Sequence, residues 1–117
     1  MPLTRQQRQA ARVGALARAY SRLFRAQHEQ QGSLHVCWGL PQRAYPRGGA
    51  TYGDTYLTGH KEWARSPARI RHETVHADQW RRYGYRFAWL YLLAGSKAQA
   101  NRFEIEAGLQ DGGYQQR

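Results

Sequence analysis

The feature that most constrains this chain is the run from His72 to His76, whose sequence is His-Glu-Thr-Val-His. On a helix, positions four apart share one face about one turn apart, so both imidazoles can point at the same spot. Imidazole nitrogens are common zinc ligands, and a zinc ion fits between two of them at this spacing. The run therefore predicts a helix that carries two ligands of one zinc ion.

Glu73 follows the first histidine and is rotated by about 100° around the predicted helix, so it can reach a water on the metal without binding the metal. Zinc lowers the pKa of such a water to near neutrality, and a carboxylate then takes its proton as the water attacks a carbonyl carbon. The run thus predicts a zinc-dependent hydrolase with Glu73 as the general base. The competing interpretation makes His72 and His76 ordinary surface or core histidines.

A catalytic zinc site takes three protein ligands, so a third has to come from elsewhere in the chain. The metzincin spacing is excluded, because its third histidine would stand at position 82, which is Arg82. No histidine follows His76, and the remaining carboxylate candidates are Asp78, Glu104, Glu106 and Asp111. Asp78 points off the ligand face of the helix, which leaves the carboxylates nearer the C-terminus.

Residues 101–107 are predicted to form a helix that folds back beside the motif helix. Here the chain resembles the gluzincins, zinc peptidases whose third ligand is a glutamate, and especially their smallest members, over about residues 71–108. In that family the ligand glutamate often begins a Glu-x-x-Ala-Asp run, and Glu104-Ile105-Glu106-Ala107-Gly108 matches it except at the last position. The resemblance implies a metalloprotease with Glu104 as third zinc ligand and a peptide or protein as substrate.

The roles of three residues near the predicted site stay open. Glu106 is the alternative ligand, because it would face about 200° away from Glu104 on a helix and only one of the two can bind the metal. Gly108 stands where the family has an aspartate that orients a ligand histidine, and glycine has no side chain for that task, so either another group orients the histidine or the site is weaker. Gln79 matches a variant of the motif in some small gluzincins, where its role can be structural.

The resemblance also implies two parts of a substrate site. The donor for the developing oxyanion is commonly a tyrosine or histidine, and the candidates, each of which can instead be a packing residue, are Tyr83, Tyr85, Tyr91 and His60. An edge strand beside the cleft would pair with an extended peptide. The segment from Thr51 to Thr58 is the predicted strand, and its substrate-binding candidates are Thr51, Tyr52, Tyr56 and Thr58.

Around the motif, hydrophobic periodicity predicts an α+β fold that begins with a helix. Thr4 is its N-cap, and the helix runs to about Gln30. Its packed face is an apolar stripe at spacings of three and four, made of Val13, Leu16, Tyr20, Leu23 and Phe24. The remaining face is rich in arginine, which favours a solvated surface over contact with nucleic acid or a membrane.

The middle of the chain predicts a small antiparallel sheet. One strand runs from Ser33 to Leu40, where apolar and polar residues alternate, and the other is the segment from Thr51 to Thr58. Gly53-Asp54 can instead form a tight turn inside a hairpin, which would divide that second strand in two.

The second half of the chain predicts helices. Ser66 is the N-cap and Pro67 the first residue of the motif helix, which Gly84 ends. Two shorter helices follow, one from about Tyr85 to Leu93 and one from Ala98 to about Leu109.

Length and charge define the remaining expectations. A chain of 117 residues fits one domain, residues 1–117. The net charge of +10, mostly from arginine, makes a nucleic-acid-binding protein the rival hypothesis and a catalytically silent peptidase-like domain the third. The N-terminus lacks a signal-peptide pattern, and the apolar stretch at residues 87–94 is too short to cross a membrane. Cys37 is the single cysteine, so no internal disulfide can form, which fits a reducing compartment. These features predict a cytoplasmic protein.

Overall fold

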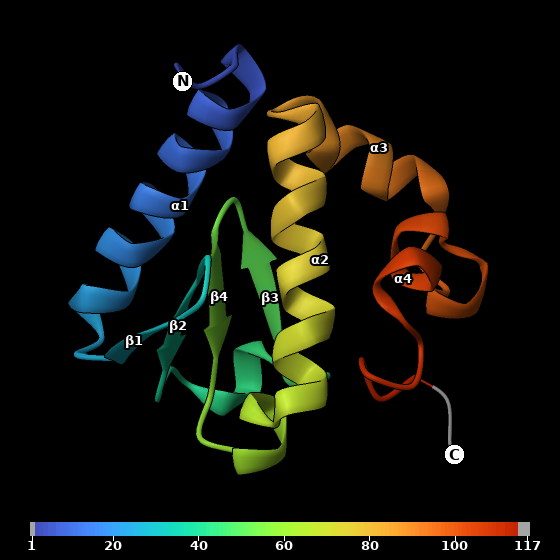
Figure 1. Ribbon diagram of the computed structural model, residues 1–117. Coiled ribbons are helices and arrows are strands. Elements are labelled where there is room, and N and C mark those ends of the chain that lie inside the picture. Colours follow the sequence, from blue (N-terminus) through green and yellow to red (C-terminus); the bar gives the residue numbers. More distant parts are fainter. Residues whose placement is uncertain (1, 115–117) are drawn as a thin grey trace.

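The computed structural model describes residues 2–114 and has the α+β architecture that the sequence predicts (Figure 1). In this part of the chain there are four α-helices and one sheet of four strands. Along the sequence the elements are α1 (Arg5–Leu23), β1 (Gln27–Gln31), β2 (Leu34–Trp38), β3 (Gly49–Tyr52), β4 (Thr55–Thr58), α2 (Pro67–Tyr83), α3 (Arg86–Ala94) and α4 (Arg102–Ala107). Among the described residues, no helix has both the length and the apolar character needed to cross a bilayer.

The sheet is mixed, with the strand order β1-β2-β4-β3. β1 pairs antiparallel with β2, and β3 with β4, but β2 and β4 run parallel, with Val36 opposite Tyr56. The antiparallel prediction is therefore wrong for the central pair. The connection after β2 is long enough to reach the far edge of the sheet, where β3 runs opposite to β2. The tight turn at Gly53-Asp54 then brings β4 back between them, parallel to β2.

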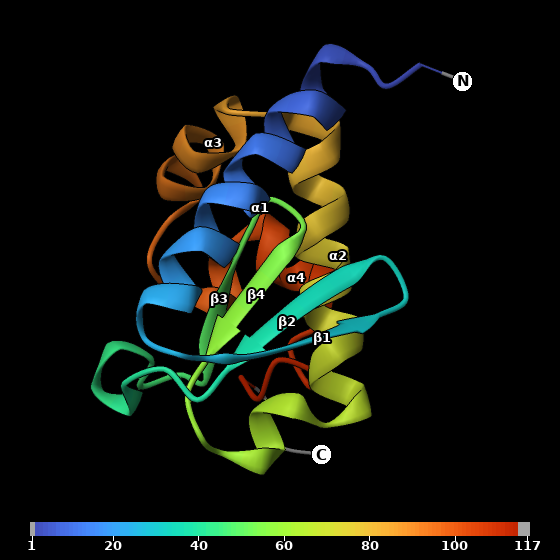
Figure 2. The ribbon, with the colours of Figure 1, turned by 90° about the vertical axis from the view of Figure 1, so that its left-hand side faces the viewer.

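The helices lie on both faces of the sheet (Figure 2). α1 covers one face, where Ala17 shares a core cluster with Leu57. α2 covers the other face, where Ala77 shares a cluster with Val36. A third cluster joins α1 to the helical half of the molecule and is formed by Ala10, Trp80, Phe87 and Phe103.

The first helix begins as predicted but packs through different residues. Thr4 and Gln7 form a reciprocal capping box at its start. The predicted packed stripe is wrong, because Leu16, Tyr20, Leu23 and Phe24 are exposed and Val13 alone among its members is partly buried. The residues of α1 that face the core are small, namely Ala10, Gly14, Ala17 and Ser21. The backbone of Gly53 lies directly against α1 at Ala10 and Gly14, so large side chains do not fit between the helix and the β3–β4 turn.

α1 ends at Leu23 rather than at about Gln30, because Arg25 adopts a left-handed backbone conformation with a φ of 56°. Residues 27–31 form the edge strand β1 instead, and all five of its side chains are exposed. Its polar sequence has no apolar alternation, which is why hydrophobic periodicity did not predict this strand.

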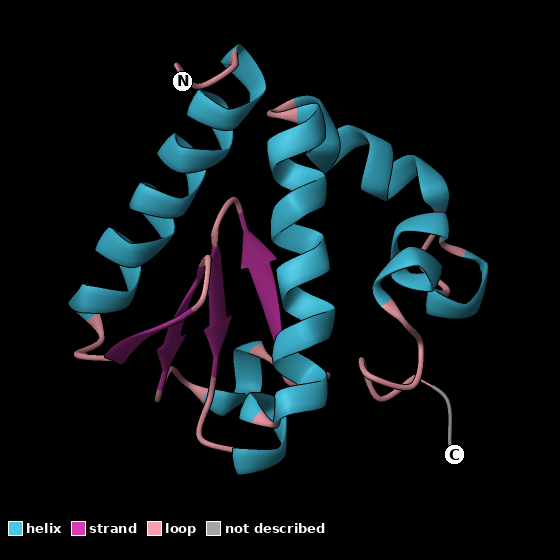
Figure 3. Cartoon of the chain, viewed as in Figure 1, coloured by secondary structure: helices cyan, strands magenta, loops and turns pink. Residues whose placement is uncertain are grey.

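The motif helix has the predicted boundaries. The Ser66 hydroxyl accepts a hydrogen bond from the Arg69 N–H, Pro67 is the first helical residue, and Gly84 ends the helix with a φ of 64°. The last helix is shorter than predicted, because residues 98–100 form a 3₁₀ turn and α4 starts only after Asn101. Figure 3 shows the C-terminal part of the chain as short helical segments joined by loops.

Candidate metal centre

Two candidate ligands lie on the buried face of α2, and the third comes from α4. His72 and His76 are one turn apart, with their Nε2 atoms separated by 3.2 Å. Oε1 of Glu104 lies 2.9 Å from each of these two nitrogens. All three side chains are buried, and their ligand atoms are close enough together to hold one metal ion.

The position of Glu104 depends on Asn101, which is fully buried. The side-chain oxygen of Asn101 caps α4 by accepting hydrogen bonds from the N–H groups of Phe103 and Glu104. Its side-chain nitrogen donates to the backbone oxygens of Tyr91 at 3.2 Å and Gly95 at 3.0 Å. Asn101 therefore connects the start of α4 to the end of α3, and Glu104 in the first turn of α4 faces the two histidines.

The second ring nitrogen of His72 is also bound. Its Nδ1 lies 2.8 Å from the backbone oxygen of Gly108. A carbonyl oxygen only accepts hydrogen bonds, so this Nδ1 carries a proton. The sequence predicted no orienting group at position 108, because glycine has no side chain. That prediction is wrong, since the main chain of Gly108 orients the ring.

His76 is oriented by Gln79, whose side chain is fully buried. Nδ1 of His76 lies 2.7 Å from the side-chain oxygen of Gln79, and the amide nitrogen of Gln79 donates to the Phe103 backbone oxygen and the Glu106 carboxylate. Because both of these partners are acceptors, the side of the amide that faces them is its NH₂ group, and its oxygen faces His76. Nδ1 of His76 therefore carries a proton and donates it to this oxygen. Glu106 thus contacts Gln79 and, at 3.6 Å, Arg82, and lies outside the ligand cluster.

The tautomers make the cluster a site for a cation. When neutral, His72 and His76 direct their Nε2 lone pairs at a carboxylate oxygen, and three acceptor atoms this close repel one another. Burial alone would raise the pKa of Glu104, but the hydrogen bonds to both histidines outweigh it and hold the pKa well below its ordinary range. Burial would likewise lower the pKa of His76, but contact with Glu104 raises it. The site can therefore hold a proton or a metal ion.

The dimensions of the cluster suit zinc. A tetrahedral zinc ion with ligand distances of about 2.0–2.1 Å keeps its ligand atoms about 3.3–3.4 Å apart. The three ligand atoms lie 2.9 to 3.2 Å apart, so a slight outward movement reaches that spacing. Two imidazoles with protonated Nδ1 atoms and one carboxylate also form a common zinc donor set that leaves one position open. The residues present therefore fit a zinc ion.

The second oxygen of Glu104 accepts a hydrogen bond from the Tyr91 hydroxyl on α3. Burial, together with this carboxylate, raises the pKa of Tyr91. Of the four predicted oxyanion donors, Tyr91 alone lines the cleft beside the cluster, but its hydroxyl is engaged by Glu104. Tyr83 and Tyr85 lie at the junction of α2 and α3, and His60 lies in the exposed segment after β4.

Glu73 is buried, and both of its carboxylate oxygens have partners. Oε2 lies 2.7 Å from Nε of Arg69, one turn earlier on α2, and each side chain is 3% exposed. Oε1 accepts a hydrogen bond of 2.8 Å from the Thr51 hydroxyl on β3. Arg69 also donates to the backbone oxygens of Gly49 and Gly112. One guanidinium thus connects Glu73 to the edge strand and to the C-terminal segment.

A cleft of about 500 Å³ opens beside the cluster and is lined by the three candidate ligands, Glu73, β3 and one side of α3. Thr51 and Tyr52 of the edge strand line it as predicted. Tyr56 and Thr58, the other two substrate-binding candidates, lie on the inner strand β4, because the predicted strand is divided into two strands. Both side chains are fully buried there and do not line the cleft.

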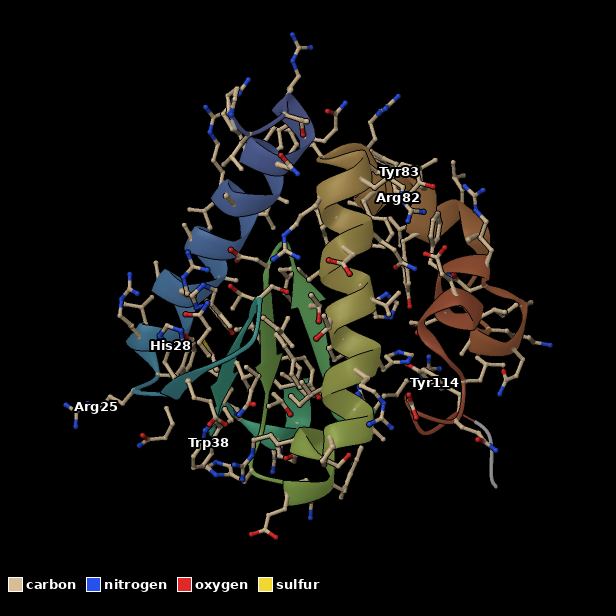
Figure 4. All side chains as sticks on the ribbon, viewed as in Figure 1. Arg25, His28, Trp38, Arg82, Tyr83 and Tyr114 are labelled. Carbon is tan, nitrogen blue, oxygen red and sulfur yellow. The ribbon has the colours of Figure 1, made fainter. Side chains whose placement is uncertain are left out.

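The C-terminal segment supplies contacts that the sequence did not reveal. A Cβ atom on Gly112 would overlap the ring of His72, so a glycine lets the segment pass this close. Tyr114 lines the cleft beyond it, with its ring centroid 5.9 Å from that of His72 (Figure 4). Burial and the nearby Glu104 raise the pKa of Tyr114. No motif marks this tyrosine, whereas the helical spacing of Arg69 and Glu73 was a detectable signal of an ion pair.

Comparison with known proteins assigns no family to this chain. No family model matches it, and no curated protein and no solved structure matches it. Its function therefore has to be inferred from the chemistry of the site.

Proposed function

We propose that this chain is a zinc-dependent hydrolase, and specifically a peptidase of the gluzincin type. One observation carries the proposal: Gly108 and Gln79 hold the Nδ1 protons of His72 and His76, so both Nε2 lone pairs converge on Oε1 of Glu104. Orientation of each imidazole from its far side is what zinc-binding histidines require.

Each side chain of the site would have its own role in hydrolysis. Zinc bound by His72, His76 and Glu104 would supply a water of lowered pKa and polarise the substrate carbonyl. Glu73 lines the same cleft and would take the proton of the attacking water and deliver it to the leaving amine. Tyr91 holds the second oxygen of Glu104, so its hydroxyl orients a ligand. Tyr114 therefore replaces Tyr91 as the candidate donor to the developing oxyanion.

A peptide suits the cleft because the edge strand β3 forms one wall. An extended substrate can pair with such an edge through its main chain. The pairing would be partial, since the Thr51 backbone oxygen already accepts a hydrogen bond of 3.0 Å from the Trp80 indole. The opposite wall includes Phe87 and Leu92 of α3, which would contact apolar substrate side chains.

A second candidate is a zinc-binding protein that does not hydrolyse peptides. The bonds of Glu73 favour it, because Arg69 and Thr51 engage both carboxylate oxygens. Each carboxylate oxygen keeps a second lone pair that can accept a proton, but the two bonds fix the direction in which the carboxylate points. Catalysis would require one of the free lone pairs to face the water on the metal. If the carboxylate has to turn, the Thr51 bond is the easier one to break, since a hydrogen bond from a neutral hydroxyl is weaker than one from a buried guanidinium.

Zinc content and cleavage of a disordered protein such as casein, measured on the same preparation without chelators, separate the two candidates. For a peptidase we expect about one zinc per chain and cleavage that Glu73→Gln reduces roughly 10²–10⁴-fold without loss of zinc. Glu29→Gln, an exposed carboxylate on β1, is the matched control and should keep full activity. Bound zinc without any cleavage would favour the second candidate, and absence of zinc would refute both.

A further inference from the structure

The solvent face of α3 is almost entirely apolar. Trp89, Leu92 and Leu93 are 71%, 70% and 83% exposed, and Tyr85 just before the helix is also exposed. Their spacing puts them on one side of the helix. The one charged residue on that side is Arg86. The other side of α3 packs into the core. An exposed apolar surface of this kind marks a contact site more often than a solvated one.

The chain around this face is strongly cationic. Between Asp78 and Glu104 the sequence has no acidic residue, while its cations are Arg81, Arg82, Arg86, Lys97 and Arg102. Figure 4 shows Arg82 at the end of α2, next to the start of α3. Arg82 has one acidic neighbour, Glu106 at 3.6 Å, and Lys97 follows the other end of the helix. Exposed positive charge therefore flanks the apolar face at both ends.

We propose that this α3 face, formed by Tyr85, Trp89, Leu92 and Leu93, docks onto the surface of an anionic lipid bilayer. The nine residues of α3 extend about 14 Å, too short to span a membrane but suited to lie in its surface. Leucines of such a helix enter the boundary of the acyl chains, and tryptophan and tyrosine lie at the headgroup level. The flanking cations contact the phosphates of acidic lipids.

A second copy of the chain fits this face less well. Each copy has a net charge of +10, and contact between two α3 faces would bring the same cations together. A bilayer with acidic lipids instead offers negative charge around an apolar interior. Because Leu92 also lines the cleft, docking brings the mouth of the cleft to the headgroup region.

Co-sedimentation with vesicles tests the proposal. We expect binding to vesicles of phosphatidylcholine mixed with phosphatidylglycerol, weaker binding to phosphatidylcholine alone, and loss of binding as NaCl rises from about 0.1 M to about 0.5 M. Leu93→Gln should weaken binding by roughly tenfold. Leu23→Gln on α1, where the side chain is 81% exposed against 83% for Leu93, is the matched control and should bind like the unchanged protein.

Fluorescence gives a second readout of the same contact. Acidic vesicles should shift the tryptophan emission to the blue, and Trp89→Phe should remove most of the shift while the protein still binds. Both leucines are exposed, so circular dichroism should show each variant folded. Equal binding of Leu93→Gln and the unchanged protein, an equal loss in Leu23→Gln, or self-association without vesicle binding would each overturn the proposal.

Discussion

Substitution of Arg69 by methionine should destabilise the protein severely. The change keeps an apolar stem of similar shape but removes the guanidinium 2.7 Å from Glu73, at a place where both side chains are 3% exposed. The unpaired carboxylate would stay almost wholly shielded from bulk solvent there, and breaking one side of a buried pair costs about 3–5 kcal/mol. The hydrogen bond from Thr51 remains, so we expect a loss near the lower end, about 3 kcal/mol.

Urea unfolding of the metal-free protein measures this loss, and a double-mutant cycle identifies its cause. Glu73→Gln removes the carboxylate charge that is left unpaired when Arg69 is replaced. The free energy of unfolding lost by the double variant should therefore be smaller, by at least about 2 kcal/mol, than the sum of the losses of the two single variants. Arg71→Met is the matched control on the same helix: its side chain is 62% exposed beside Asp111, and its loss should stay below about 1 kcal/mol. Additive losses, or an Arg69 variant no less stable than the Arg71 variant, would refute the buried pair.

Gln79→Ala should weaken zinc binding about 10–100-fold, because His76 loses the acceptor of its Nδ1 proton. Competition with a chromogenic chelator measures the affinity, and Gln110→Ala, at an exposed position, should leave it unchanged. Gly112→Ala should also reduce zinc affinity in the same titration, because its methyl group would press on the His72 ring, and an unchanged affinity would show that the C-terminal segment does not pack there. In the metal-free protein, the pKa of Glu104 is lowered, so this residue stabilises the fold when the pH is above its ordinary pKa of 4.5 and loses the effect in acid. The pKa of His76 is raised, so this residue stabilises the fold when the pH is below its ordinary pKa of 6.5 and loses the effect as the pH rises. Urea unfolding should therefore show maximal metal-free stability between pH 4.5 and 6.5, and a curve that rises steadily through pH 8 would contradict this coupling.

The predictions that succeeded depend on local spacing. The start and end of α2 follow from Ser66, Pro67 and Gly84, whose effects on the backbone act within one turn. The approach of Glu104 to the histidines agrees with the motif spacing and with the expected fold-back of a short helix. The helix boundaries are encoded within a few residues, whereas Glu104 lies 28 residues beyond His76 and was expected from the resemblance to the gluzincins.

The predictions that failed depend on partners distant in sequence. The large apolar residues of α1 suggested its packed face, but contact with Gly53 admits only small side chains there. The parallel pairing of β2 with β4 depends on the path of a long connection, which hydrophobic periodicity does not describe. At Gly108 the orienting group is a backbone oxygen, and a backbone atom has no signature in the sequence.

The central claim is that His72, His76 and Glu104 bind one zinc ion together. An anomalous-difference map at the zinc absorption edge, from crystals of the zinc-loaded protein, tests it most directly. We expect one peak, bounded by Nε2 of both histidines and Oε1 of Glu104, with Glu106 still in contact with Gln79. A zinc-loaded crystal without a peak between the two imidazoles, or with Glu106 as the bound carboxylate, would contradict the claim.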